Sequence, residues 1–183
     1  HWRNNNSDKR IIILLTIGGI LSAVLGAIFS LNFKPRLIST VLAIYLAVGG
    51  VAILASQIRP PTGHKEKNAR KFIVAGAIPG FFEGAYGSGG PAGVLSLLLL
   101  RVHAHRAVGS WLPVSVLVQL TPTMIYLASF NFSWEIFIGL LIAGIPAAII
   151  GSRLTKKLPE KTLRLLIGLI ILLLGVRLLL RIF

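Results

Sequence analysis

The chain has 183 residues, of which 55% are hydrophobic and 13% are charged, and its mean hydropathy is +0.83. A soluble domain of this length could not bury that much apolar surface, so the composition indicates a polytopic membrane protein. The net charge of +14 does not indicate nucleic-acid binding, because the Lys and Arg residues lie in short polar segments between apolar spans. The sequence has no cysteine, which excludes disulfides and thiolate metal sites.

Two apolar segments, 11–31 and 37–58, begin the chain. Each is long enough to cross a bilayer as a helix. The next residues, 59–71, are basic and contain two prolines and a glycine, as loops do. We therefore assign residues 1–58 to one pair of transmembrane helices and residues 59–71 to a linker loop.

Residues 72–183 form a second part of the chain. Its first segment, 72–100, is apolar but rich in glycine, and we expect a broken or re-entrant helix there rather than a continuous span. The later segments have the length and hydropathy of membrane-spanning helices, and they cover residues 107–130, 134–154 and 162–182. The sequence therefore predicts an all-α polytopic membrane protein.

The two ends of the chain share a register of 125 positions. The matched pairs are Gly19 and Gly144, Gly26 and Gly151, Gly50 and Gly175, and Asn6 and Asn131. These matches indicate two repeats, the first represented only by its end, although chance similarity between two apolar hairpins is the alternative. By symmetry, roughly 55 residues with a second Gly-rich segment should precede His1 or come from a partner chain.

The distribution of positive charge predicts how the segment 72–100 crosses the membrane. If this segment returns to its own side, all but four of the 19 Lys and Arg residues share one face of the membrane; the four are Lys34, Arg36, Arg177 and Arg181. A full crossing would divide the charges about evenly. The positive-inside rule therefore favours a re-entrant segment, and this course predicts that the two repeats have inverted topology.

Residues 76–93 read GAIPGFFEGAYGSGGPAG. Glycines here would let backbone N–H groups approach a ligand, and Pro91 suits the first residue of a new helix, whose N-terminus would favour an anion. The alternative for Gly80 and Gly84, spaced by four residues, is a helix-packing face. The candidate substrate-binding residues of this stretch are Gly87, Ser88, Gly89, Gly90 and Pro91.

Glu83 is the only acid predicted deep within a span. Burial disfavours its carboxylate form, so Glu83 is the candidate for proton coupling; the alternative is a carboxyl that only hydrogen-bonds the broken backbone. Ser110, Gln119 and Thr121 are candidates for lining a substrate cavity opposite the glycine break. The alternative for these three side chains is hydrogen bonding between helices.

Two other groups of residues have structural interpretations. His103 and His105 lie in a basic turn without an evident third ligand, so we expect no metal site, and the sequence indicates no cofactor. Tryptophans lie near the ends of predicted spans, as anchors at the membrane interface do; they are Trp2, Trp111 and Trp134.

The stretch 80–91 resembles the glycine pattern that the sulfite exporter (TauE/SafE) family of membrane transporters carries in each of two repeats, Gly-x-x-Ser-Gly-x-x-Gly-x-Gly-Gly-Gly. Residues 106–110 (RAVGS) and 144–154 (GIPAAIIGSRL) resemble further stretches of the second repeat, and residues 1–58 resemble the end of the first. Two positions depart from the pattern. Glu83 stands where Ser is usual and Pro91 where a third Gly is usual, so substrate and ion coupling need not follow the family.

The resemblance implies a secondary transporter of a small anion, such as sulfite, sulfoacetate or another sulfur-containing or organic anion, without enzymatic activity. We expect proton coupling through Glu83, a location in the plasma (inner) membrane of a prokaryote, and no nucleic-acid partner. A homo-oligomer or a separate N-terminal half are the candidate protein partners. Two alternatives remain: an assembly subunit that does not transport, and an intramembrane serine hydrolase built on Ser88, which matches no nucleophile motif.

Overall fold

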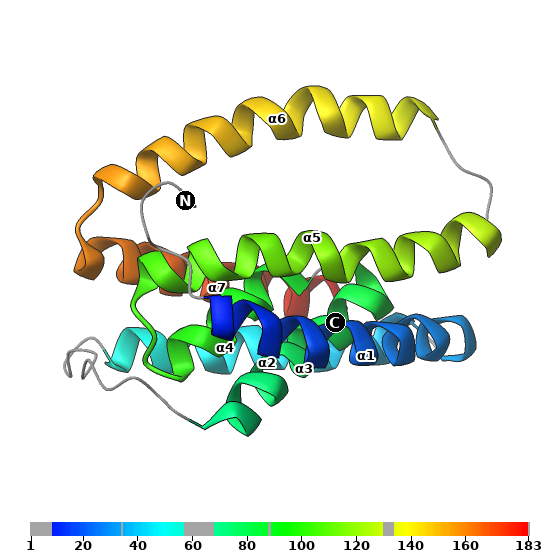
Figure 1. The fold of residues 1–183 in the computed structure, drawn as a ribbon, viewed down its shortest axis with the longest axis horizontal. Coiled ribbons are helices and arrows are strands. Elements are labelled where there is room, and N and C mark those ends of the chain that lie inside the picture. Colours follow the sequence, from blue (N-terminus) through cyan, green and yellow to red (C-terminus); the bar gives the residue numbers. More distant parts are fainter. Residues whose placement is uncertain (1–8, 34, 57–67, 88, 130–133, 183) are drawn as a thin grey trace.

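A computed structural model describes residues 9–33, 35–56, 68–87, 89–129 and 134–182. All the secondary-structure elements in these ranges are helices. The helices are α1 (Lys9–Asn32), α2 (Pro35–Ala55), α3 (Ala69–Tyr86), α4 (Gly89–Leu99), α5 (Ala104–Ser129), α6 (Trp134–Lys157) and α7 (Glu160–Ile182) (Figure 1). The prediction of an all-α protein is confirmed for this part of the chain.

Four of these helices are long and apolar enough to cross a membrane. They are α1, α2, α5 and α7. Helix α6 contributes a shorter apolar stretch, Ile142–Thr155, and α4 is itself short. Helix α3 is not among the four, because it carries Arg70, Lys71 and Glu83 among its apolar residues.

The Gly-rich segment forms two helices instead of one span. Helix α3 ends at Tyr86, and Gly87 caps it in the left-handed conformation (φ 65°), with its N–H donating to the carbonyl of Glu83 at 2.9 Å. Helix α4 begins at Gly89, two residues before the start that the sequence predicted at Pro91. Proline is tolerated in this first turn because its missing N–H would have had no partner within the helix.

Helices α3 and α4 run antiparallel. Arg70 and Lys71, from the beginning of α3, line the same pocket as Leu99 at the end of α4 and Leu100 directly after it. The two helices therefore form a hairpin whose tip lies at the break. In a hairpin of this kind the chain leaves at the end by which it entered.

Helix α1 packs on α3 through glycines, with backbone against backbone. A Cβ added at Gly18 would collide with the carbonyl of Ile73, and one added at Gly84 would collide with the carbonyl of Ala23. Small residues allow helices in a membrane to approach this closely, where packing replaces the hydrophobic effect as the source of association. The packing-face interpretation of Gly80 and Gly84 agrees with this contact.

Helices α2 and α7 form the second close pair and also run antiparallel. A Cβ added at Gly50 would meet Leu172, and one added at Gly175 would meet Ala47. At one end of this pair, Arg36 Nη2 donates to the carbonyl of Ile182 at 2.8 Å. Gly50 and Gly175, one of the glycine pairs in the register of 125 positions, thus lie in the same helix–helix contact.

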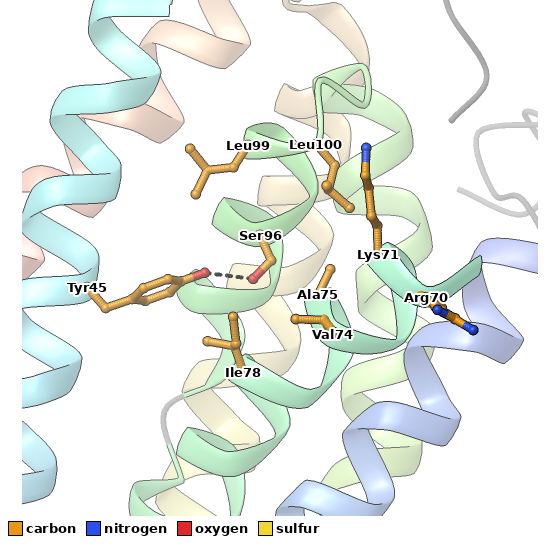
Figure 2. Close-up of a pocket in the computed structure, with 9 residues that line it drawn as sticks. All are labelled: Tyr45, Arg70, Lys71, Val74, Ala75, Ile78, Ser96, Leu99 and Leu100. Atoms are coloured by element: carbon orange, nitrogen blue, oxygen red, sulfur yellow. Dashed lines mark hydrogen bonds between the residues drawn. The ribbon is translucent and has the colours of Figure 1, made fainter. Parts of the chain in front are cut away.

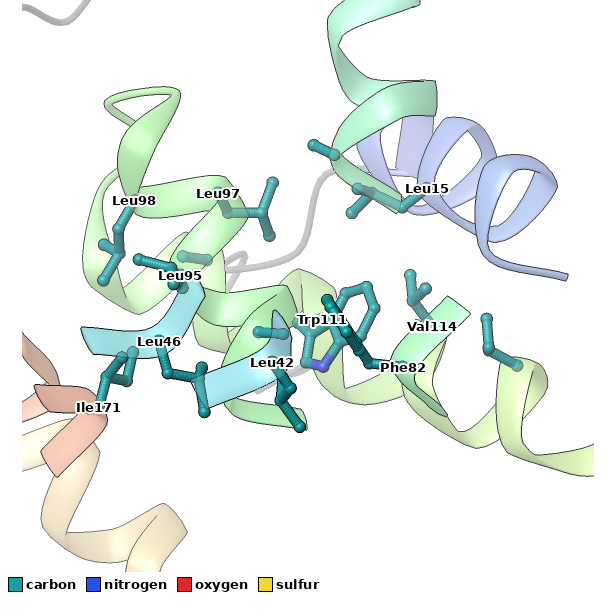
Figure 3. Close-up of a cluster of buried hydrophobic side chains, with 14 of the residues drawn as sticks. Leu15, Leu42, Leu46, Phe82, Leu95, Leu97, Leu98, Trp111, Val114 and Ile171 are labelled. Atoms are coloured by element: carbon teal, nitrogen blue, oxygen red, sulfur yellow. The ribbon is translucent and has the colours of Figure 1, made fainter. Parts of the chain in front are cut away.

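A cluster of buried apolar side chains joins six of the helices (Figure 3). It includes Leu15 of α1, Leu42 of α2, Phe82 of α3, Leu97 of α4, Trp111 of α5 and Ile171 of α7. Trp111 is 2% exposed and packs against Gly93, so its predicted role as an interface anchor is wrong. The site where its indole packs is open because Gly93 has no side chain.

Helix α6 stands apart from this cluster (Figure 1). Its described apolar side chains are exposed, and Cβ atoms added at Gly144 or Gly151 would meet nothing within 4 Å. The corresponding glycines of α1, Gly19 and Gly26, are buried against other helices. The matched helices of the two repeats therefore differ in their packing.

Candidate functional site

Glu83 lies beside the helix break, within the last turn of α3. It is 1% exposed, and its Oε1 accepts a hydrogen bond from Nε2 of Gln119 on α5. Its Oε2 has no hydrogen-bond partner among the described residues and lies against Gly89, the first residue of α4. A carboxyl group without exposure to water thus lies beside the N-terminal end of a helix.

The first residues of α4 differ in the space around them. A Cβ added at Gly89 would collide with Glu83 Oε2 and with the carbonyl of Pro79, whereas one added at Gly90 would meet nothing within 4 Å. The N–H groups of the first turn of a helix have no partner within the helix. Together with the helix dipole they favour a negative charge at this position.

A cavity of about 330 Å³ opens beside this first turn, between α4, α5 and α7. Ser115 and Gln119 contribute polar side chains to its lining, and Gly90 and Pro91 of α4 also line it. The remaining lining is apolar and consists of Val94, Val108, Trp111, Leu112, Ile167, Ile170 and Ile171. The amide of Gln119 links this cavity to Glu83, since Gln119 lines the cavity and donates to the carboxyl group.

The structure brings together most of the residues that the sequence singled out. Glu83, Gly89 and Gln119 are neighbours, and the cavity adds Gly90 and Pro91 to them. Two candidates on α5 do not join this group: Ser110 is fully buried and Thr121 is half-buried, and neither is among the described residues that line the cavity. The N–H of Gly87 is engaged in capping α3. Ser88 lies outside the described residues.

Glu160 has a role that the sequence analysis missed. From the first turn of α7 it accepts hydrogen bonds from the backbone N–H of Ala104 and, at 3.5 Å, from that of His105, so it caps the N-terminus of α5. The same carboxylate lies 2.8 Å from Nδ1 of His105 and 3.8 Å from Nδ1 of His103. A signal was present: none of the usual capping residues precedes Ala104, so a cap from elsewhere was needed.

Arg164, one turn further along α7, extends this connection. Its Nη2 donates to Ser56 Oγ at 3.1 Å and approaches the carbonyl of Leu98 at 3.4 Å. Arg164 thereby links the ends of α2 and α4. Within the described ranges, His, Cys, Asp and Glu form no group of three that could hold a metal ion.

The fold is that of a helical integral membrane protein with a broken helix and a buried acid at its centre. The family model of the sulfite exporter TauE/SafE family matches residues 1–178, and the chain belongs to this family. The chain is 27% identical over 196 aligned positions to the "Probable membrane transporter protein YjnA" of Bacillus subtilis (strain 168), with 97% of this chain and 76% of that protein covered. No solved structure matches the chain.

Membership of this family makes the chain a membrane transporter. A transporter needs a lipid environment and a small-molecule substrate, and four apolar helices supply the membrane-spanning part. The family is one of transporters, which points to a protein that is not an enzyme.

Proposed function

We propose that this protein is a secondary transporter of a small anion and that the anion binds at the break between α3 and α4. The observation that carries the proposal is the position of the buried carboxyl of Glu83 at the N-terminal end of α4, in a chain of a transporter family. Broken helices with their N-termini directed at anionic groups are how secondary transporters build substrate sites.

Glu83 and the anion compete for the same helix end. When Glu83 is ionised, its own Oε2 can satisfy the positive end of α4, because this oxygen lies against Gly89. An anion placed there repels the carboxylate and favours the protonated carboxyl. Binding of the anion and binding of a proton to Glu83 therefore favour each other, as reciprocal linkage requires. We infer that the anion and a proton cross together.

The lining of the cavity bears on the substrate. Because the side chains of its walls are mostly apolar and Ser115 and Gln119 are the polar ones near Gly90, an anion with a carbon skeleton fits it better than a fully hydrated inorganic ion. Among the anions that the family implies, a short organic acid or sulfonate such as sulfoacetate is the better candidate, and sulfite is the second.

We also propose that the repeats are related by inverted topology. Gly50 contacts Leu172 and Gly175 contacts Ala47. In the register of 125 positions, Gly175 is the counterpart of Gly50 and Leu172 is the counterpart of Ala47. The two contacts are therefore equivalent: each pairs a glycine with the counterpart of the residue that the other glycine contacts. A two-fold axis between the two helices produces such a pair of contacts. Because α2 and α7 run antiparallel, this axis is perpendicular to the helices and lies in the membrane plane.

The same proposal gives the α3–α4 hairpin a re-entrant course. Its two ends then lie on the side that carries most Lys and Arg residues, which the positive-inside rule identifies as the cytoplasmic side of a prokaryotic plasma membrane. Under the two-fold relation, Gly144 and Gly151 of α6 correspond to Gly19 and Gly26 of α1. A Gly-rich helix of the α3 kind would pack on this face of α6.

Flux measurements in proteoliposomes test the proposed function. Uptake of sulfite, sulfoacetate and a short carboxylate is measured with and without an imposed pH gradient. We expect at least one of these anions to move faster when the gradient drives protons in the same direction. Absence of flux for every anion, by protein that is folded and inserted, would reject anion transport.

A further inference from the structure

A second cavity, of about 360 Å³, lies away from the helix break, between α2 and the α3–α4 hairpin. It has the form of an open groove and is called the groove below. Figure 2 shows its position: Tyr45 reaches in from α2, and the other labelled residues come from α3, α4 and the turn after α4. The proposed anion path does not use it. It lies at the open end of the hairpin, whereas the helix break lies at the tip.

The wall of this groove is apolar and faces outward. Val74 is 57% exposed, Leu99 is 45% exposed and Ile78 is 38% exposed, and all three line the groove. In a membrane protein, side chains of this kind face lipid acyl chains. The groove is therefore a place where one acyl chain can lie between two packed elements, with contacts to both.

The hydroxyl groups in the groove are already paired with each other. The Tyr45 hydroxyl and Ser96 Oγ are 2.7 Å apart, and Ser96 Oγ also donates to the carbonyl of Ala92 at 3.0 Å. A polar ligand would have to break these bonds to gain its own. An apolar occupant leaves them intact, and this difference favours a hydrocarbon chain over a polar solute.

The end of the groove is positively charged. Lys71 and Arg70 belong to its lining, and in Figure 2 the Lys71 side chain extends beside Leu100. Both cations lie in the first turn of α3, at the end of the basic segment 59–71 and on the side that carries most of the positive charge. Basic pockets between membrane helices on this side suit the phosphate groups of anionic lipids.

We propose that this groove is a binding site for an anionic phospholipid, with one acyl chain along Val74, Ile78 and Leu99 and the phosphate at Lys71. The lipid touches α2, α3 and α4 together. It therefore adds a further contact between α2 and the hairpin beside the hydrogen bond of Tyr45 and Ser96. The site does not depend on what the protein transports.

Native mass spectrometry of the detergent-purified chain tests this site. Phosphatidylglycerol and phosphatidylcholine with identical acyl chains are titrated onto the wild type and onto Lys71→Gln. We expect phosphatidylglycerol to bind more tightly to the wild type, and the Lys71→Gln variant to bind it about fivefold more weakly, since one basic residue contributes about that factor at a lipid surface. Arg106→Gln removes an exposed cation of α5 that does not line the groove, and it should leave both affinities unchanged.

A third variant separates the apolar part of the site from the charged part. Val74→Trp fills the groove and should weaken both lipids, while circular dichroism reports that the helices remain. Equal binding of the two lipids by the wild type, or equal losses in Lys71→Gln and Arg106→Gln, would overturn the proposal. Displacement of phosphatidylglycerol by soluble glycerol phosphate would also overturn it, as would occupation of the groove by a second copy of the chain.

Discussion

Gln119 of α5 donates a hydrogen bond to Oε1 of Glu83 on α3, and this bond fixes the buried carboxyl at the start of α4. The two residues are 36 positions apart in the chain, Glu83 on α3 before the break and Gln119 on α5, beyond α4. Gln119 also lines the cavity beside Gly90, so a ligand in that cavity and the carboxyl group share one amide.

Replacing Glu83 with Gln should remove the response of anion flux to a pH gradient, because the amide cannot exchange a proton. Binding of the anion should persist, since the variant mimics the protonated carboxyl. Flux in proteoliposomes with and without a gradient is the measurement. Glu160→Gln is the matched control, because this acid caps α5 away from the break and should keep the response. A Glu83→Gln protein with the wild-type response would show that Glu83 is structural.

Substitutions of the two glycines at the start of α4 should have different effects, one on transport and the other on stability. Gly90→Ala adds a methyl group into open space beside the cavity and should reduce flux without lowering stability. Gly89→Ala places the same group against Glu83 Oε2 and the carbonyl of Pro79, and should destabilise the protein by about 1–3 kcal/mol. Thermal unfolding in detergent and flux assays report the two effects. Equal stability of the two variants would contradict the geometry at Gly89.

The contact between α1 and α3 gives a prediction about stability alone. In Gly84→Ala the new methyl group would collide with the backbone of Ala23, and we expect a loss of about 1–3 kcal/mol in the free energy of unfolding. The control is Gly139→Ala, a glycine of α6 whose added methyl group meets nothing and which does not share the face of Gly144 and Gly151. This variant should be unchanged or slightly more stable, because Ala favours the helix over Gly. A similar loss in both variants would argue against the backbone contact.

Removing the cap on α5 should also lower stability. Glu160→Ala leaves the N–H groups of Ala104 and His105 without their acceptor, and loss of a helix cap costs about 0.5–2 kcal/mol. The neighbouring exposed Lys161 provides the comparison, since Lys161→Ala should change stability by less than about 0.5 kcal/mol. Denaturant unfolding of both variants measures the difference. A Glu160→Ala protein as stable as the wild type would show that this cap does not stabilise the fold.

The course of the α3–α4 hairpin is open to cysteine labelling, because the chain has no cysteine of its own. Arg70 lies at the start of the hairpin and Arg106 lies after it, and both are exposed positions for a cysteine substitution. A re-entrant hairpin predicts that an impermeant maleimide reaches both from the same side. Position 36 lies at the start of α2, the end of this helix that is far from the 59–71 segment. Arg36→Cys should therefore react only from the opposite side of the membrane. Labelling of Arg70→Cys and Arg106→Cys from opposite sides would show a full crossing.

Local signals made the helix break and its buried acid predictable from sequence. The glycines from Gly87 on and Pro91 predict a helix break without any knowledge of packing, and Glu83 is the one acid deep in an apolar segment. Contacts between distant positions were not readable. Glu160 caps a helix 56 residues earlier in the chain, and Trp111 is buried only because Gly93 faces it. The separate position of α6 also has no local signal, since its composition resembles that of α1.

The glycines of α3 that pack on α1, Gly76, Gly80 and Gly84, have a consequence for how the chain enters the bilayer. Helix α3 is not among the four helices apolar enough to cross a membrane by their own composition. Its partner α1 is among them and is synthesised first. When α3 leaves the ribosome, the surface that accepts its glycines is therefore already in the lipid. We expect α1 to serve as an internal insertion aid for α3, so that a chain shortened by α1 would leave α3 outside the bilayer.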